Sequence, residues 1–269
     1  MASRSHTEVR FKFGQNWQRF LSSVDEQRVL AAEKALTTVL GNIRGKTFLD
    51  AGCGSGLSSL AAHRLGAHVA AFDYDTQSVA CTKELQRCHG LSWRTEEGSV
   101  LDANYLTKLG QFDIVSSWGV LHHTGKMYEA FRNIAIPVKP GGLLFISIYN
   151  DQGFLSLYWK VVKRIYNTGW FGRVLMTLIH LPYVGGRFIV RKITRRPIER
   201  GMSLWVDYID WLGGYPFEVA KPRDVIEFFA GLGFTVVKTN LVGGSLVGRR
   251  SGNNEFVFRK NLDQPERHR

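Results

Sequence analysis

The chain has 269 residues, of which 44% are hydrophobic and 22% charged, a composition typical of one globular domain or two small ones. Its three cysteines, Cys53, Cys81 and Cys88, form no CxxC pair, which argues against a disulfide scaffold or a zinc site and favours a reducing, cytoplasmic setting. The opening segment MASRSHTEVRFKF is charged where a signal peptide needs an apolar core, so secretion is not expected.

The positive charge is concentrated in one part of the chain. The net charge is +12, and residues 151–200 contain ten Lys and Arg against two acidic residues. Such a local excess bears on the partners of a protein rather than on its fold.

Apolar residues recur with alternating helical and strand periodicities along most of the chain. Helices are predicted at 26–43, 57–66, 76–90, 126–138 and 221–234. Short apolar strands are predicted at 46–51, 67–75, 112–120, 143–150, 235–242 and 254–260. This alternation predicts an α/β fold with a doubly wound, mostly parallel sheet.

The regular alternation stops after Asn150 and resumes near Lys221. We therefore expect an insertion after the strand at 143–150, taken as the fifth strand of the sheet, where loops that leave the carboxyl ends of strands line a ligand crevice. The predicted division begins with an N-terminal helical lid segment (1–45) and a cofactor-binding core (46–150). A basic apolar insertion (151–204), a part that completes the sheet (205–260) and a tail (261–269) follow.

A glycine-rich turn follows the first predicted strand, in the sequence DAGCGSG. Gly52, Gly54 and Gly56 lack the Cβ atoms that would keep a ligand away from the backbone. A dinucleotide fingerprint has its third glycine one place later, where this chain has Leu57. Asp50 would repel a pyrophosphate but attract an ammonium group, so the turn favours S-adenosylmethionine as the cofactor.

A second acid stands at the end of the next predicted strand. Asp73 lies 21 residues after Gly52, where a carboxylate can accept both hydroxyls of an adenosine ribose. Asp75 is an alternative, but its position favours capping the helix that follows. Asp73 is therefore the expected ribose ligand.

These motifs resemble those of a known family. FLDAGCGSG, AFDYD, GSVLD, FDIVSSWGVLHH and VKPGGLLFIS follow one another as in the class I S-adenosylmethionine-dependent methyltransferases, over about residues 46–150. The LHH and KPGG elements are similar to those of the ubiquinone and menaquinone biosynthesis methylases. The resemblance implies a Rossmann-like fold, the methyl donor S-adenosylmethionine and a small lipophilic or aromatic acceptor.

The resemblance also implies roles for further residues. Asp50 would hold the ammonium group through the loop or a water, and Ser99 and Val100 would flank the adenine. Many relatives have an acid where Ser99 stands, so either its hydroxyl or Asp102 would serve here. Trp118 would line the cleft near the sulfonium or pack in the core.

Methyl transfer is an in-line displacement that needs alignment and, for some acceptors, removal of a proton, and it requires no metal. His122 and His123 are the candidate catalytic bases, since histidine titrates near neutrality. In the resembling methylases a histidine is common at the place of His123. Either histidine can instead hold the turn before the following helix.

Two aromatic segments are candidates for the acceptor site. Trp17 lies in FKFGQNWQRF, which would fold over the cofactor or anchor a helix on the core. The segment 205–220 would form a wall of the acceptor pocket or a structural hairpin. Its candidate residues are Trp205, Tyr208, Asp210, Trp211, Tyr215 and Glu218.

The insertion contains no run of 18 apolar residues, so it is not expected to span a membrane. It fits either an interfacial amphipathic segment on an anionic membrane or a solvated helical cap. A small-molecule O-methyltransferase is the favoured function. The alternatives are a nucleic-acid or protein methyltransferase that uses the basic insertion, and a non-catalytic cofactor-binding protein.

Overall fold

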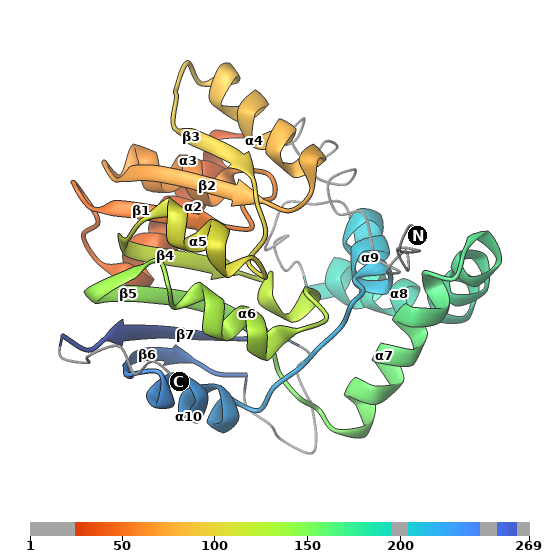
Figure 1. Ribbon diagram of the computed structural model, residues 1–269. Helices are drawn as coiled ribbons and strands as arrows, with labels where there is room; N and C mark the ends of the chain where they lie inside the picture. Colours follow the sequence, from red (N-terminus) through yellow and green to blue (C-terminus); the bar gives the residue numbers. More distant parts are fainter. Residues whose placement is uncertain (1–24, 195–203, 243–251, 263–269) are drawn as a thin grey trace, which may run out of the picture.

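A central sheet with helices on both faces forms the body of the computed structural model, which describes residues 25–194, 204–242 and 252–262 (Figure 1). Within these ranges the side chains of residues 183–185, 187–194, 204–207 and 210 lie outside the description. The predicted lid segment is therefore described only from Asp25 onward, and Trp17 lies outside the described residues.

The sheet has seven strands in the order β3-β2-β1-β4-β5-β7-β6. The first five strands in this order, from β3 through β2, β1 and β4 to β5, pair in parallel. Strand β7 runs antiparallel to both β5 and β6. The predicted α/β fold with a mostly parallel sheet is thus confirmed. The strands are β1 Thr47–Ala51, β2 His68–Asp73, β3 Arg94–Glu97, β4 Phe112–Trp118, β5 Val138–Tyr149, β6 Phe234–Asn240 and β7 Asn253–Lys260.

Neighbouring residues of the central strands face opposite sides of the sheet, because side chains alternate along a strand. Phe48 and Ile114 pack against α2 and α3 on one side, while Leu49 and Val115 pack against α5, α6 and α10 on the other. Both faces are therefore buried, as in parallel sheets generally. The helices are α2 Glu26–Leu40, α3 Leu57–Arg64, α4 Thr76–Cys88, α5 Ala103–Leu109, α6 Met127–Ile134 and α10 Pro222–Gly231.

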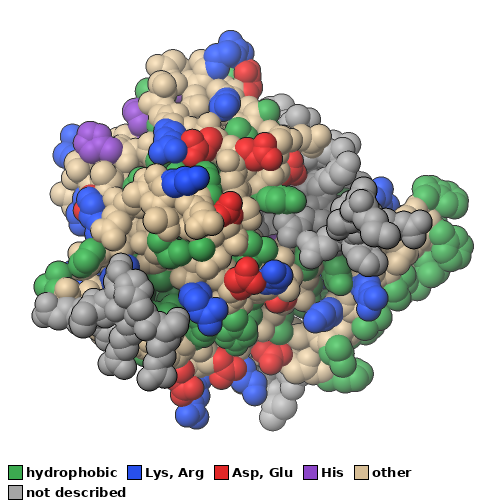
Figure 2. All heavy atoms as spheres, viewed as in Figure 1, with side chains coloured by type: hydrophobic (Ala, Val, Ile, Leu, Met, Phe, Trp, Pro, Cys, Tyr) green, Lys and Arg blue, Asp and Glu red, His purple; other side chains and the backbone are tan. Residues whose placement is uncertain are grey.

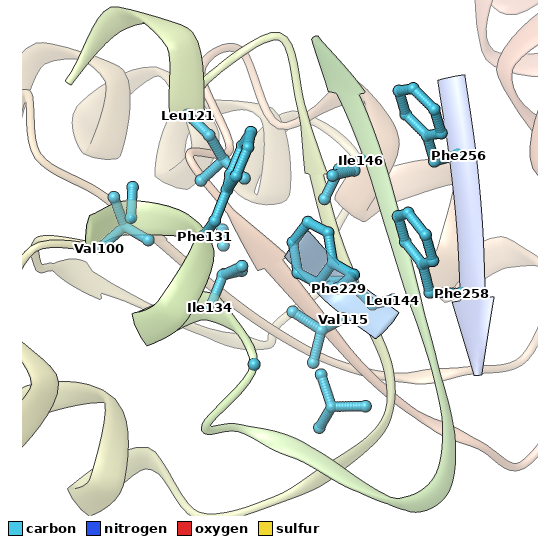
Figure 3. Close-up of a cluster of buried hydrophobic side chains, with 14 of the residues drawn as sticks. Val100, Val115, Leu121, Phe131, Ile134, Leu144, Ile146, Phe229, Phe256 and Phe258 are labelled. Atoms are coloured by element: carbon cyan, nitrogen blue, oxygen red, sulfur yellow. The ribbon is translucent and has the colours of Figure 1, made fainter. Parts of the chain in front are cut away.

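The larger core cluster fills the second of these faces. Phe131 from α6, Phe229 from α10 and Phe256 and Phe258 from β7 meet over β4 and β5 (Figure 3). The rings of Phe229 and Phe258 lie 4.7 Å apart between centroids. This packing joins the C-terminal strand and helix to the parallel part of the sheet.

The insertion after β5 folds into two helices, α7 Phe154–Tyr166 and α8 Trp170–Thr194, which lie beside the sheet rather than on it (Figure 1). The next helix, α9 Leu204–Gly213, packs against α7 and α8. The segment from residue 205 therefore begins as a helix, so the structural hairpin considered for it is wrong. Among the described helices, none is long and apolar enough to cross a membrane.

Candidate functional site

The glycine-rich turn joins β1 to α3 and needs glycine for two separate reasons. Gly52 and Gly54 have φ angles of +88° and +54°, which L side chains rarely adopt. A Cβ atom on Gly52 would also lie 2.4 Å from Cγ2 of Val120. The turn is therefore pressed against the segment that follows β4, which leads into the two candidate histidines.

Asp50 is buried at the end of β1, with 4% of its surface exposed. Its Oδ2 accepts a hydrogen bond of 2.6 Å from the hydroxyl of Ser59 in α3. Burial raises the pKa of Asp50 to about 6; the hydrogen bond from Ser59 opposes this effect, and the nearby charge of Asp73 adds to it. This carboxylate is costly to ionise unless a cation comes close.

Asp73 ends β2 directly beside the glycine turn. Its two oxygens accept 2.9 Å hydrogen bonds from the backbone N–H groups of Gly54 and Asp75. Burial nevertheless raises the pKa of Asp73 to about 6, because these bonds do not fully replace water. Within the described part of the chain, neither Asp50 nor Asp73 forms an ion pair with Lys, Arg or His. The pair can therefore receive a ligand that is cationic and carries hydroxyl groups.

The acids considered as alternatives act as helix caps. Asp75 accepts a 2.9 Å hydrogen bond from the N–H of Gln77 at the start of α4. Asp102 accepts one of 3.0 Å from the N–H of Tyr105 at the start of α5. The predicted cap at Asp75 is thus confirmed, and the side chain of Asp102 is occupied in the same way.

Ser99 and Val100 lie next to Asp73, because the N–H of Gly98 donates a 3.0 Å hydrogen bond to the Asp73 carbonyl. Val100 is buried in the larger core cluster. Ser99 is partly exposed, and its hydroxyl oxygen accepts a 3.2 Å hydrogen bond from the N–H of Leu101. The structure therefore brings the predicted adenine-flanking pair to the predicted ribose ligand.

Trp118 ends β4 on the side of the sheet that α2 and α3 cover. Its indole N–H donates a 2.8 Å hydrogen bond to Oε1 of Glu255 on β7. This contact directs the ring along the sheet toward β7. Both predicted roles of Trp118, as a wall of the cofactor cleft and as a packing residue, therefore remain open.

The candidate histidines form a short 3-10 helix, η1 Leu121–His123, after β4. His122 is buried, with 1% exposure, and its ring centroid lies 4.0 Å from that of Tyr149. His123 is more exposed, and its Nδ1 lies 2.7 Å from the carbonyl oxygen of Pro216. Since a carbonyl can only accept, Nδ1 carries the proton, and Nε2 is the basic nitrogen of the neutral ring.

Glu218 anchors the turn that bears these histidines. Its carboxylate accepts a 3.1 Å hydrogen bond from the N–H of Met127, the first residue of α6. Its own N–H donates a 3.0 Å bond to the carbonyl of His122. Burial raises the pKa of Glu218, although hydrogen bonds from backbone N–H groups oppose this effect. Glu218 was predicted to contact the acceptor, but its oxygens bind the backbone of this turn.

The aromatic residues near α9 pack mainly against one another. Trp211 lies with its ring 5.7 Å from that of Tyr149 and beneath the ammonium group of Lys163, 4.2 Å from the ring centroid. Tyr208 is buried, and its hydroxyl donates a 2.9 Å hydrogen bond to the carbonyl of Thr177 in α8. Tyr215 is partly buried against the same cluster, whereas the side chains of Trp205 and Asp210 lie outside the described residues.

Sequence reasoning did not identify Tyr149, which the structure places at the centre of the site. Its ring touches His122, His123, Trp211 and Phe217, with centroid separations between 4.0 and 5.7 Å. Its position at the carboxyl end of β5 was the available signal, since ligand crevices lie there. Among the described residues, no group of three or more His, Cys, Asp or Glu side chains could hold a metal ion.

The core of the chain matches a family model described as "Methyltransferase domain" over residues 49–146. The fold and this match are those expected from the predicted resemblance to class I methyltransferases, and they support it for the core of the chain. Solved structures with the same fold include magnesium protoporphyrin IX methyltransferase from Synechocystis, at 17% identity and a TM-score of 0.53 over 92% of this chain and 94% of that one. A second is a methyltransferase from Methanosarcina mazei, at 15% identity and a TM-score of 0.53 over 84% and 98%.

The chain is also similar to ubiquinone biosynthesis O-methyltransferases. That of Aeromonas salmonicida is 33% identical over 43% of this chain and 48% of the relative. That of Bordetella avium is 34% identical over 41% and 45%. The chain thus matches about half the length of these curated relatives.

Proposed function

We propose that the protein is an S-adenosylmethionine-dependent O-methyltransferase that acts on a small lipophilic or aromatic acceptor. One observation carries the proposal: Asp50 and Asp73 enclose a glycine turn, and neither is paired with a cation in the described chain. A ligand with an ammonium group, a sulfonium and a ribose would offset the cost of burying both carboxylates. A pyrophosphate would increase that cost.

When bound, S-adenosylmethionine would supply the electrophilic methyl group. Asp50 would attract its ammonium end, and Asp73 would accept hydrogen bonds from its ribose hydroxyls. Ser99 and Val100 would flank the adenine, since they adjoin Asp73. The side chain of Asp102 already caps α5, which favours the Ser99 hydroxyl as the polar contact on the adenine side.

Removal of the acceptor proton is assigned to His123. Its Nδ1 is held by the carbonyl of Pro216, so that Nε2 can accept a proton from a hydroxyl group. His122 would act as a positioning residue, since its ring is buried against Tyr149. Trp211 and Tyr215 would limit the acceptor site on the insertion side.

Oxygen is favoured as the methylated atom because a histidine base suits the deprotonation of a hydroxyl group. The names of the similar curated proteins, ubiquinone biosynthesis O-methyltransferases, support this choice. The comparisons give no support to a nucleic-acid or protein methyltransferase, or to a non-catalytic cofactor-binding protein.

A peripheral contact with an anionic membrane, on the cytoplasmic side, is part of the same proposal. It rests on the excess of Lys and Arg in residues 151–200 and on the exposed apolar side chains of α7 and α8. A lipophilic acceptor would be met at such a surface rather than in free solution.

The test is to incubate the full chain and a cell extract with S-adenosylmethionine that carries a labelled methyl group. Labelled products are then identified by mass spectrometry, with the His123→Gln variant as the matched control. We expect one labelled lipophilic or aromatic molecule that becomes much weaker with the variant. Label in nucleic acid or protein, or in nothing although calorimetry detects cofactor binding, would contradict the proposal.

A further inference from the structure

The hairpin of α7 and α8 presents an unusually apolar outer surface. Phe154 is 84% exposed, Trp170 77% and Phe171 72%, where side chains of this kind are normally buried. Figure 2 shows hydrophobic side chains along the edge of the molecule formed by this hairpin, with Lys and Arg beside them. The other exposed apolar side chains of the two helices are Leu157, Tyr158, Val161, Val174, Leu175, Leu178, Ile179 and Leu181.

These side chains follow the helical repeat, so each helix has one outward stripe. On α7 the stripe runs from Phe154 through Leu157 and Tyr158 to Val161. On α8 it runs from Trp170 and Phe171 through Val174, Leu175, Leu178 and Ile179. Spacings of three and four residues place the members of each stripe on one side of their helix.

The charges of the hairpin have a single sign. Residues 154–194 contain seven Lys and Arg and no Asp or Glu. Lys160, Arg164 and Arg173 are exposed, and none of them forms an ion pair among the described residues. An apolar stripe flanked by exposed cations complements a surface that is anionic outside and apolar beneath.

The hairpin is nevertheless firmly attached to the rest of the protein. Its inner side buries Trp159, Val162 and Met176 against α9. The hydroxyl of Tyr158 lies 2.7 Å from Nε2 of His180, which links α7 to α8. The inner sides of α7 and α8 are therefore already packed, and the outward stripes are a separate surface.

Resting on the proposed function, we infer that the two stripes of α7 and α8 form a docking face for the anionic phospholipid bilayer. The first turns of α8 enter the headgroup region while Lys160, Arg164 and Arg173 meet the lipid phosphates. The aromatic cluster around Trp211 and Tyr149 lies between this face and His123. A lipophilic acceptor would then reach the histidine from the membrane side.

Vesicle flotation of the full chain tests this docking face. Vesicles are made of phosphatidylcholine alone or of phosphatidylcholine with phosphatidylglycerol. We expect binding that needs the anionic lipid and falls about tenfold in the double variant Trp170→Ser, Phe171→Ser, because each large side chain contributes buried apolar area. Lys160→Glu with Arg173→Glu should weaken binding through charge alone.

Matched controls carry the same chemical changes elsewhere on the surface. Leu262→Ser and Val237→Ser remove exposed apolar side chains outside the hairpin, and Lys83→Glu reverses an exposed charge on α4. These variants should bind vesicles as the wild type does. Equal loss in the control and hairpin variants would overturn the inference.

Tryptophan fluorescence gives a second readout that does not depend on loss of folding. Vesicles should shift the emission of the wild type to shorter wavelength, and Trp170→Phe should reduce the shift while vesicle binding persists. A self-associated chain that ignores vesicles, and becomes monomeric in the Phe171→Ser variant, would instead assign the face to a second copy and overturn the inference. Cofactor affinity measured by calorimetry in the same variants keeps the two proposals separate: vesicle binding without methyl transfer would contradict only the proposed function.

Discussion

The parallel core and the α7–α8 hairpin use the same apolar residue types with opposite results. In β5, Leu144 and Ile146 are buried on one face and Phe145 on the other, because helices cover both faces of the sheet. In α8, Trp170 and Phe171 are largely exposed, because α7 and α9 cover only one side of that helix. The fold itself buries these apolar residues of β5, whereas Trp170 and Phe171 of α8 would be buried only by a partner outside the chain.

The ionisable residues differ between the two regions in a corresponding way. The core encloses two carboxylates, Asp50 and Asp73, that lack a cationic partner among the described residues. The hairpin exposes cations and contains no acid. The core is therefore suited to a small cationic ligand and the hairpin to an extended anionic surface, so changes in one region should leave the function of the other intact.

The largest expected effect comes from Gly54→Val, which should abolish binding of S-adenosylmethionine. A β-branched residue cannot easily adopt φ of +54°, so the turn must move and the hydrogen bond from residue 54 to Asp73 is lost. Titration calorimetry measures the affinity, and vesicle flotation should give the wild-type result.

The matched control for this variant is Gly90→Val. Gly90 also has a positive φ, of +62°, but a Cβ there meets no atom within 4 Å. This variant should lose stability from the same kind of strain and keep its cofactor affinity. Unchanged affinity in Gly54→Val would contradict the assignment of the glycine turn.

His123→Gln should lower kcat by about 10²-fold to 10⁴-fold, the usual contribution of a general base. Cofactor affinity should stay the same, because the proposed cofactor ligands Asp50 and Asp73 lie on β1 and β2, whereas His123 lies in η1 after β4. Glutamine keeps a hydrogen-bonding group near Pro216, which limits the structural disturbance. Single-turnover rates with the identified acceptor measure the effect. A loss of the same size in His122→Phe, at full stability, would move the base assignment to His122.

These two variants also mark how far the sequence could predict the site. The glycine turn, Asp50 and Asp73 follow one another at fixed spacing along β1 and β2, so local pattern was enough. The contacts of His123 with Pro216 and of Glu218 with Met127 join segments about 90 residues apart, and no local signal announces them. The strand β3 was not named in advance because its sequence RTEE is polar, and α5 is only seven residues long.

A fall in pH should weaken cofactor binding but stabilise the unliganded core. The pKa of both Asp50 and Asp73 is about 6 in the folded chain, above the 3.8 of an ordinary aspartate. Ligand binding needs both carboxylates charged, so well below pH 6 cofactor affinity should fall about tenfold per pH unit for each of them, about a hundredfold for the pair. Calorimetry between pH 5 and pH 8 would measure it, and vesicle binding should change little over this range.

These two carboxyl groups stabilise the unliganded chain more at low pH than at high pH. A raised pKa means that the folded chain holds these protons more tightly than the unfolded chain. Their contribution to the free energy of unfolding is therefore fully present below about pH 4 and is lost as pH rises through 6. Asp50→Asn should flatten both pH dependences, since asparagine does not titrate. Affinity that is independent of pH in the wild type would remove the carboxylates from the cofactor site.

The smallest effect separates two acids that stand two positions apart. Asp75→Ala should lower the free energy of unfolding by about 1 kcal/mol, because it removes the cap of α4, yet leave cofactor affinity unchanged. Asp73→Asn should lower cofactor affinity and change the free energy of unfolding little. The asparagine side chain can still occupy the place beside Gly54, but it lacks the charge that receives the ligand. Thermal unfolding and calorimetry on both variants give the answer. If Asp75→Ala lost affinity while Asp73→Asn kept it, the ribose contact would belong to the loop after β2 rather than to the strand end, and the core would no longer owe its ligand to two enclosed carboxylates.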